Sequence, residues 1–180
     1  IQSNYLFKDI LVYEDIKKPQ LLLSLLKKLA FRVGSEIVIN SLANDLDVSP
    51  NTITKYVDLL EKIFVIKKLY AFSNNKDKEI QKGVKIYFTD VGLRNALIQN
   101  LNDLEHRDDQ GQLFENICFI EMIKNDMYNP AGVFKNYYFW RTYDNKEIDF
   151  VQEYNGLVIG IECKVSPVAR IPTATQRDFE

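Results

Sequence analysis

Four charged residues in the second half of the sequence have the types and spacing of a metal-dependent hydrolytic site. Asn155-Gly156 separates two apolar-rich segments, which predicts a two-residue β-hairpin turn. Counting outward from this turn places Asp149 directly opposite Glu162, and at the next pair on the same face Glu147 lies opposite Lys164. Side chains alternate across a strand, so all four share one face. Facing carboxylates repel each other, and a divalent cation between them removes that cost.

The same register makes further predictions about the hairpin. Tyr154 is expected to face Leu157, and Phe150 to face Ile161. The second face is apolar and is expected to be buried; its residues are Ile148, Phe150, Ile159, Ile161 and Cys163. A slip of one residue would move the carboxylates to opposite faces of the hairpin, so the site depends on this turn.

Lys164 gives the acidic cluster a specific chemical interpretation. It lies two residues beyond Glu162, where its ammonium group can position a water molecule or offset charge on a phosphate. Carboxylates, a hard cation and a lysine together predict a phosphodiesterase. In the structural alternative, Glu147 and Lys164 form a surface ion pair that contributes well under ~1 kcal/mol. The spacing alone leaves both interpretations open.

Two resemblances support the catalytic interpretation. Asp149 with Glu162-Cys163-Lys164 resembles the D…(D/E)xK signature of the restriction-endonuclease-like nuclease superfamily. A longer set of segments, from about Leu21 onward, resembles the C-terminal domain of unknown function in a family of bacterial and archaeal AAA-type ATPases. The segments that carry this second resemblance are 111–116, 138–142, 147–150 and 161–164.

These resemblances imply roles for individual residues. Glu115 corresponds to the first acidic residue of the nuclease site, and Glu115, Asp149 and Glu162 are the implied ligands of Mg²⁺ or Mn²⁺. Lys164 is the implied catalytic lysine, acting with Asp149 and Glu162. Taken by itself, Glu115 is also explained as a first-turn acid that the helix dipole stabilises. ATP is expected only in a missing N-terminal ATPase domain, because the sequence contains no G-x-x-x-x-G-K-[ST] motif.

Composition narrows the class of protein. The chain has 180 residues, a formal net charge of −2 and a pI near 5.6, so no overall basic field indicates nucleic-acid binding. Cys118 and Cys163 lack metal-ligand spacing and are expected to be reduced, buried thiols of a cytoplasmic protein. No apolar run is long enough to span a membrane. The chain is expected to be a fragment, and its oligomeric state is not predicted.

Periodicity and capping signals predict an α+β protein with two domains. Residues 1–19 are expected to be a linker or a remnant of the ATPase lid, and residues 20–99 a winged-helix domain. Within that domain, helices are expected at 20–32, 40–46 and 50–62, and strands at 63–71 and 83–89. Ser49 caps the third helix, with Pro50 in its first turn, and Asn40 or Ser41 is the expected cap of the second.

The second half has its own pattern of elements. Asp90 is expected to cap a short helix that ends near residue 99, and residues 100–109 are expected to be a linker. Residues 110–180 are expected to be a restriction-endonuclease-like core that is incomplete at its C-terminus. It begins with a helix at 110–127, followed by a strand at 137–141 and the hairpin. The expected buried face of that helix is Leu113, Ile117, Ile120, Met122 and Ile123, widened by Phe114 and Phe119.

DNA is the expected nucleic-acid partner. Lys55 lies on the third helix of the expected winged helix, and residues 67–85 contain six lysines against Asp77 and Glu79. The candidate phosphate-binding residues are Lys55, Lys76, Lys78, Lys82 and Arg141. Each assignment has an alternative that stays open. The lysine-rich hairpin could contact a protein instead of DNA, and Arg141 could pair with Asp144 or Glu147 instead of a phosphate. For the expected fragment as a whole, two functions stay open: it is a nuclease, or it is a non-catalytic module that docks DNA or a partner protein.

Overall fold

A computed structural model of the chain describes residues 19–72, 83–129, 135–142 and 146–165. These residues form a mixed α+β structure with one six-stranded sheet, so the predicted α+β class is confirmed. Within the same ranges, no helix has both the length and the apolar character needed to cross a membrane.

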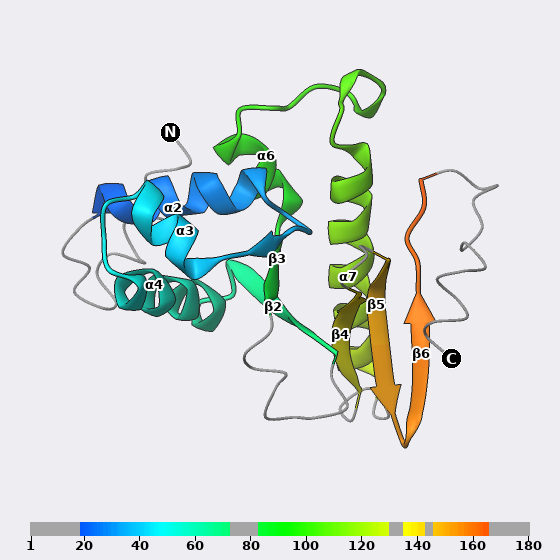
Figure 1. The fold of residues 1–180 in the computed structure, drawn as a ribbon. Coiled ribbons are helices and arrows are strands. Elements are labelled where there is room, and N and C mark those ends of the chain that lie inside the picture. Colours follow the sequence, from blue (N-terminus) through cyan, green and yellow to red (C-terminus); the bar gives the residue numbers. More distant parts are fainter. Residues whose placement is uncertain (1–18, 73–82, 130–134, 143–145, 166–180) are drawn as a thin grey trace.

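The elements follow the chain in an order close to the prediction (Figure 1). The helices of the described residues are α2 (Pro19–Phe31), α3 (Ile39–Asp45), α4 (Pro50–Lys62), α6 (Val91–Leu97) and α7 (Gln110–Tyr128), with a 3₁₀ turn η1 (Leu104–His106). The strands are β1 (Glu36–Ile37), β2 (Ile66–Ala71), β3 (Val84–Phe88), β4 (Asn136–Arg141), β5 (Glu147–Tyr154) and β6 (Leu157–Ile161).

Local capping explains where several helices begin. Ser49 accepts a hydrogen bond from the Thr52 backbone N–H at 3.2 Å, with Pro50 as the first helical residue of α4. Asp90 caps α6 in the same way. The cap expected for α3 was wrong, because the helix begins at Ile39 and is preceded by Val38, which makes no side-chain cap. Preference for a polar cap was overridden there by the packing of Ile39 against the core.

The strand expected at residues 63–71 begins three residues later. Ile63 is the C-cap of α4, and Phe64 has a φ of 59° that breaks the extended conformation before β2. The short strand β1 was not predicted. It has only two residues and pairs with β3, so its formation depends on a non-local partner rather than on its own pattern.

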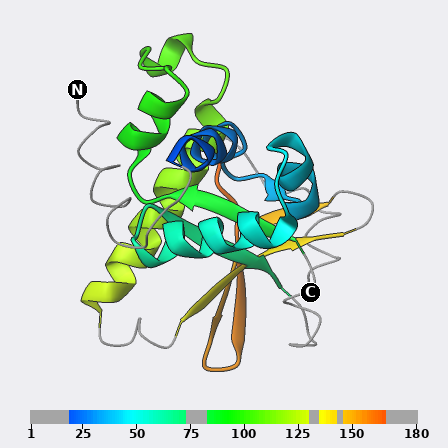
Figure 2. The same cartoon turned by 90° about the vertical axis from the view of Figure 1, so that its left-hand side faces the viewer.

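The sheet joins the two halves of the chain. Its strand order is β1-β3-β2-β4-β5-β6, in which β2 and β4 pair in parallel and the other neighbours are antiparallel. The central pairing sets Tyr70 beside Tyr138 and Ala71 beside Phe139. One sheet therefore contains strands from both sides of the 100–109 segment. The shorter helices gather around its β1–β3 end, and the β5–β6 hairpin extends beyond them (Figures 1 and 2).

The hairpin has the predicted register. Tyr154 pairs with Leu157 and Phe150 with Ile161, which confirms the two-residue turn at Asn155-Gly156. The ladder ends at this second pair. On the buried face, Ile148 and Phe150 are inaccessible as expected, but Ile159 is 48% exposed. Its assignment to the core was wrong because β6 is the last strand of the described sheet and no described element covers it.

A β-bulge interrupts the pairing of β4 with β5. Tyr138 pairs with Val151 and Trp140 with Ile148, so β5 has one more residue than β4 between these pairs. Phe150 and Val151 are consequently buried in succession, which strict alternation does not allow. The bulge lies beside Asp149 and therefore affects the direction of that side chain.

Helix α7 packs across the sheet through Phe119. The Phe119 ring stacks on Phe150 of β5 at 5.2 Å and contacts Tyr87 of β3 at 4.8 Å between ring centroids. The buried face predicted for α7 was partly wrong, since Ile117 is 40% exposed. Asn116 is buried instead because its side-chain amide bonds both backbone groups of Phe88.

The segment between α6 and α7 is held by buried arginines. Arg107 donates to both oxygens of Asp109 at 2.8 Å, and Arg94 pairs with the same carboxylate. Arg94 also donates to the Ala30 carbonyl at 2.9 Å, which ties the segment to α2. The two cysteines, Cys118 and Cys163, are free and partly buried, so their expected burial is only partly confirmed.

Candidate functional site

A cavity of about 530 Å³ lies where the start of α7 meets β3, β5 and the segment after β6. Its charged lining consists of four carboxylates and two lysines: Glu115, Glu147, Asp149, Glu162, Lys85 and Lys164. We call it the carboxylate cavity. The α2–β1 turn closes one side with Gly34 and Ser35, and the first turn of α7 adds Gly111 and Gln112.

The fold brings the predicted metal ligands together from three elements. Glu115 is on α7, whose position is fixed by the Phe119 contacts with β3 and β5. Asp149 comes from β5 beside the bulge. Glu162 and Lys164 follow β6, so the confirmed hairpin register brings them back to Asp149. Asp149 Oδ2 accepts a hydrogen bond from the Cys163 backbone N–H at 2.7 Å, which orients that carboxylate.

Lys85 is a site residue that the sequence analysis did not identify. Its side chain is 3% exposed, forms an ion pair with Glu147 and lies 3.4 Å from Glu115 Oε1. Its Nζ also lies over the Phe139 ring, 5.4 Å from the centroid. The sequence did contain a signal for this role: Lys85 lies among the apolar residues of β3. A charged residue in a buried strand requires a partner of opposite charge.

Glu115 is held by two donors and by a glycine. Tyr87 donates its hydroxyl proton to Glu115 Oε1 at 2.5 Å, and Lys85 approaches the same oxygen. Gly34 has a φ of 72°, and a Cβ added there would lie 3.3 Å from each carboxylate oxygen of Glu115. This turn therefore favours glycine for its conformation and for its closeness to the carboxylate.

Burial and charge act in opposite directions on the groups of the cavity. Burial raises the pKa of Glu115 above its usual value, and Lys85 opposes that shift. Burial likewise raises the pKa of Glu162, with Lys164 opposing at 2.8 Å. Burial alone would lower the pKa of Lys85, but Glu115, Glu147 and other acidic groups raise it, which keeps its ammonium charged.

The ion pairs differ from the expected ones. Glu147 pairs with Lys85 and Lys164 with Glu162, in place of the cross-strand pair between Glu147 and Lys164. Arg141 lies 3.9 Å from a carboxylate oxygen of Glu147 and the same distance from Glu36. Arg141 was considered either as a phosphate-binding residue or as the partner of a carboxylate, and in the structure it lies near carboxylates.

The remaining candidate phosphate-binding residues lie away from the carboxylate cavity or outside the described residues. Lys55 is exposed on α4. Lys76, Lys78 and Lys82 lie outside the described ranges, so the tip of the lysine-rich hairpin is not described. Lys68 is paired with Asp58 and Glu61, and Lys85 is buried, so these two of the six lysines between residues 67 and 85 are engaged inside the protein.

The donor set fits a hard divalent cation in type and charge. Carboxylate oxygens are the preferred ligands of Mg²⁺ and suit Mn²⁺. Four carboxylates against two ammonium groups leave the cavity a formal charge of −2. Across the described ranges, no three His, Cys, Asp or Glu side chains are already placed to hold one metal ion. Because the carboxylates are not already placed to share one ion, binding requires some movement of their side chains, and Lys164 already engages Oε2 of Glu162.

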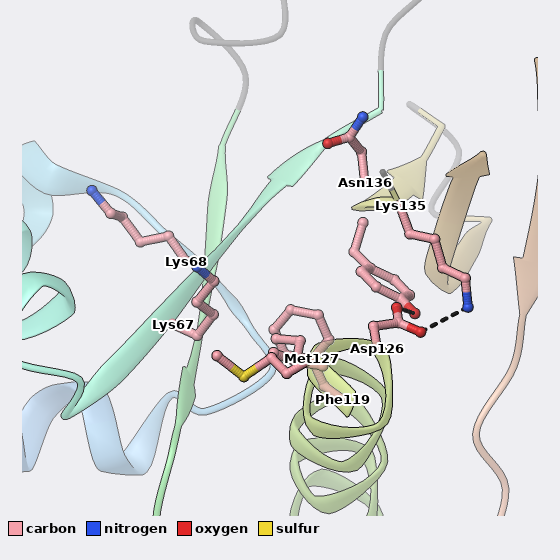
Figure 3. Close-up of a pocket in the computed structure, with 9 residues that line it drawn as sticks. Lys67, Lys68, Phe119, Asp126, Met127, Lys135 and Asn136 are labelled. Carbon is pink, nitrogen blue, oxygen red and sulfur yellow. Dashed lines mark hydrogen bonds and ion pairs between the residues drawn. The ribbon is translucent and has the colours of Figure 1, made fainter. Parts of the chain in front are cut away.

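A second cavity, of about 430 Å³, lies at the other end of α7 (Figure 3). Its acidic residue, Asp126, is already satisfied by Lys135 at 2.7 Å and by the Tyr137 hydroxyl at 2.5 Å. Phe119 and Met127 of α7 supply much of the apolar wall. This cavity lacks the clustered carboxylates of the first, so its residues do not suggest metal chemistry.

Comparison with known proteins gives families and relatives of unknown function. The model of a domain of unknown function, DUF8612, matches residues 1–104, and that of a second, DUF4143, matches residues 110–176. No solved structure matches the chain significantly.

Three similar proteins are longer than this chain. An uncharacterized protein of Mycobacterium tuberculosis is 30% identical over 126 residues, which is 68% of this chain and 27% of that protein. An uncharacterized protein of Haemophilus influenzae is 27% identical over 84% of the chain and 36% of its own length. One of Methanocaldococcus jannaschii is 25% identical over 67% of the chain and 25% of its length. The chain thus spans about a quarter to a third of these relatives. Because the first family model covers more than half of it, the chain belongs to the DUF8612 family and has a DUF4143 match in its second half.

Proposed function

We propose that the carboxylate cavity is the metal-dependent phosphodiesterase site of a nuclease, with DNA as its substrate. The observation that carries the proposal is the convergence of Glu115 with Asp149 and Glu162 in one cavity. These residues come from α7, β5 and the segment after β6, and sequence spacing alone did not require Glu115 to meet the hairpin. A helix that turned Glu115 away would have favoured a docking module.

The order of elements supports the proposed fold. The series α2-β1-α3-α4-β2-β3 has the helices and the hairpin of a winged helix, with β1 pairing with the returning strand β3. The series α7-β4-β5-β6 has the helix followed by three antiparallel strands that the resemblance to restriction-endonuclease-like nucleases implies. We therefore assign the first half to a winged-helix module and the second to a nuclease core.

Each residue of the cavity has a separate proposed role in metal binding or catalysis. Glu115, Asp149 and Glu162 hold the cation, and the Cys163 N–H keeps Asp149 oriented. A bound Mg²⁺ or Mn²⁺ supplies Lewis-acid polarisation of the phosphate and lowers the pKa of the attacking water. Lys164 is 46% exposed, so its ammonium can leave Glu162 and offset charge on a phosphate oxygen.

Two features bear on how DNA approaches an acidic chain. The first turn of α7 lines the cavity with Gly111 and Gln112, and the N-terminus of a long helix favours phosphate groups. Exposed Lys55 on α4 provides a separate cationic contact. Because the matched region makes up only 25–36% of each relative, we further propose that the complete protein carries an AAA-type ATPase domain that acts with this chain.

An exposed apolar strand favours the second candidate, a non-catalytic module that docks DNA or a protein. Leu157, Val158 and Ile159 of β6 are all exposed on the last strand of the described sheet. Such an edge can pair with another chain. This candidate requires no metal, so metal binding separates the two.

The first test is Mn²⁺ binding by isothermal titration calorimetry. Wild-type protein is expected to bind Mn²⁺, and Asp149→Ala and Glu162→Ala are expected to abolish binding because each removes a ligand. Two carboxylate variants serve as matched controls: Glu153→Ala on the same strand as Asp149, and Glu121→Ala on the same helix as Glu115. A folded wild-type protein that binds no Mn²⁺ would refute the nuclease proposal.

Cleavage is tested next on single- and double-stranded DNA with Mn²⁺ or Mg²⁺. Lys164→Met is expected to abolish cleavage while Mn²⁺ binding persists, because Lys164 acts on the phosphate and not on the cation. Loss of Mn²⁺ binding in Lys164→Met would show that the lysine only organises Glu162. Cleavage that persists in Lys164→Met would exclude the proposed role of its ammonium group.

A further inference from the structure

Lys85 brings a charge from the first half of the chain into the carboxylate cavity. It lies on β3, inside the DUF8612 match, whereas the four carboxylates lie inside the DUF4143 match. At 3% exposure it cannot extend into solvent, and the Phe139 ring and two carboxylates surround its ammonium group. Lys164, by contrast, is 46% exposed and can move away. Lys85 is therefore the fixed cation of the site.

The ion pairs divide the carboxylate oxygens unevenly. Lys85 and Tyr87 both engage Oε1 of Glu115, and Lys164 engages Oε2 of Glu162. The Cys163 N–H engages Oδ2 of Asp149. Among the contacts of the described residues, one oxygen of each of these three carboxylates is thus left for a ligand.

Glu147 differs from those three carboxylates. Lys85 pairs with its Oε1, and Arg141 lies 3.9 Å from its Oε2. Both oxygens of Glu147 therefore already face a cation. Arg141 also lies 3.9 Å from Glu36, which offsets its charge outside the cavity. Glu147 is therefore already neutralised by Lys85 and has less capacity to bind a metal ion than the other three carboxylates.

The formal charge of the cavity also indicates that it binds one divalent cation and not two. Its four carboxylates and two lysines leave −2, which one divalent cation neutralises. A second divalent cation would make a partly buried site positive, which is unfavourable at low dielectric. We propose that Lys85 takes the place of a second metal ion, so that the carboxylate cavity binds one Mg²⁺ or Mn²⁺ through Glu115, Asp149 and Glu162. The proposal rests on the metal site proposed above and assigns Lys85 a positioning role.

The test counts Mn²⁺ ions by calorimetry in wild type and in Lys85 variants. Wild type is expected to bind one ion. Lys85→Met removes the charge with little loss of side-chain length, so Glu147 is released and the formal charge of the cavity falls to −3. A second Mn²⁺ would then bring that charge to +1 instead of +2, and it is expected to bind. Lys85→Arg keeps the charge and is expected to restore a count of one.

A matched control exists on the neighbouring strand. Lys68 of β2 is also mostly buried and pairs with two carboxylates, Asp58 and Glu61, but it does not line the carboxylate cavity. Lys68→Met is expected to leave the Mn²⁺ count at one. Circular dichroism of each variant establishes that it is folded before its binding is interpreted.

A double variant separates charge from structural damage. Lys85→Met with Glu147→Gln returns the formal charge of the cavity to −2, so it is expected to bind one Mn²⁺ again. A wild type that binds two ions overturns the inference whether or not the variants fold, and so does a folded Lys85→Met that binds one ion with unchanged affinity. A wild type that binds none overturns the metal site itself, which distinguishes the two failures.

Discussion

Substituting Asn116 tests how much its hydrogen bonds stabilise the contact between α7 in the second half of the chain and β3 in the first. Its side chain is 1% exposed on α7. Its Nδ2 donates to the Phe88 carbonyl at 2.7 Å, and its Oδ1 accepts from the Phe88 N–H at 2.8 Å. The amide thus satisfies both backbone groups of a residue that is itself inaccessible, at the point where α7 meets β3.

The cost of Asn116→Ala follows from the two groups it leaves unpaired. A buried donor or acceptor without a partner costs about 1–3 kcal/mol. Two such groups destabilise the fold by about 2–6 kcal/mol, and the better helix propensity of alanine offsets about 0.5 kcal/mol of that loss. We therefore expect the free energy of unfolding to fall by about 2–5 kcal/mol, a large share of the usual stability of a domain.

The assay is urea unfolding followed by fluorescence of the single tryptophan, Trp140 in β4. At an m-value of about 2 kcal/mol/M, the midpoint is expected to fall by about 1–2.5 M. Asn125→Ala, an exposed position on the same helix, is the matched control and should change stability by less than about 0.5 kcal/mol. A loss below about 1 kcal/mol in Asn116→Ala would mean that Phe88 finds other partners, and the account of this junction would be wrong.

Two further predictions concern the arginine network and the Gly34 turn. Arg107, with Arg94, lowers the pKa of Asp109 from 3.8 to about 2, so its stabilising effect is present above pH 3.8 and is lost as pH falls through about 2. Asp109→Asn should therefore cost about 2 kcal/mol at pH 7, and urea unfolding should show that difference shrinking toward pH 2; a cost that does not change with pH would contradict this. Gly34→Ala should lower the melting temperature, because an L-residue at a φ of 72° costs about 1–2 kcal/mol and its Cβ approaches Glu115. Gly111→Ala, where a Cβ meets nothing within 4 Å, should not lower it, and equal effects of the two substitutions would contradict the interpretation.

Features set by neighbours in sequence were predicted correctly. Ser49 and Asp90 begin their helices because a cap needs only its own side chain and the next backbone N–H groups. Asn155-Gly156 fixes the hairpin register because two residues with positive φ close the turn locally. The register in turn returned Glu162 to the neighbourhood of Asp149.

Features that depend on distant partners were not predicted. Asn116 was overlooked because hydrophobic periodicity assigns a polar residue to the solvent face, whereas hydrogen bonds to Phe88 offset the cost of its burial. The bulge beside Asp149 depends on how β4 pairs with β5, which neither strand specifies alone. Ile159 was assigned to the core by alternation, but burial also requires an element that covers the strand.

The sequence by itself determined the helices, their main caps, the hairpin register and the candidate carboxylates, because these follow from short-range geometry and residue type. The tertiary structure decided which of those residues meet. The parallel pairing of β2 with β4 unites the two halves in one sheet, and it brings Lys85 of β3 to Glu147 and Glu115. Contacts between residues thirty or more positions apart depend on packing of the whole chain, which no local pattern encodes.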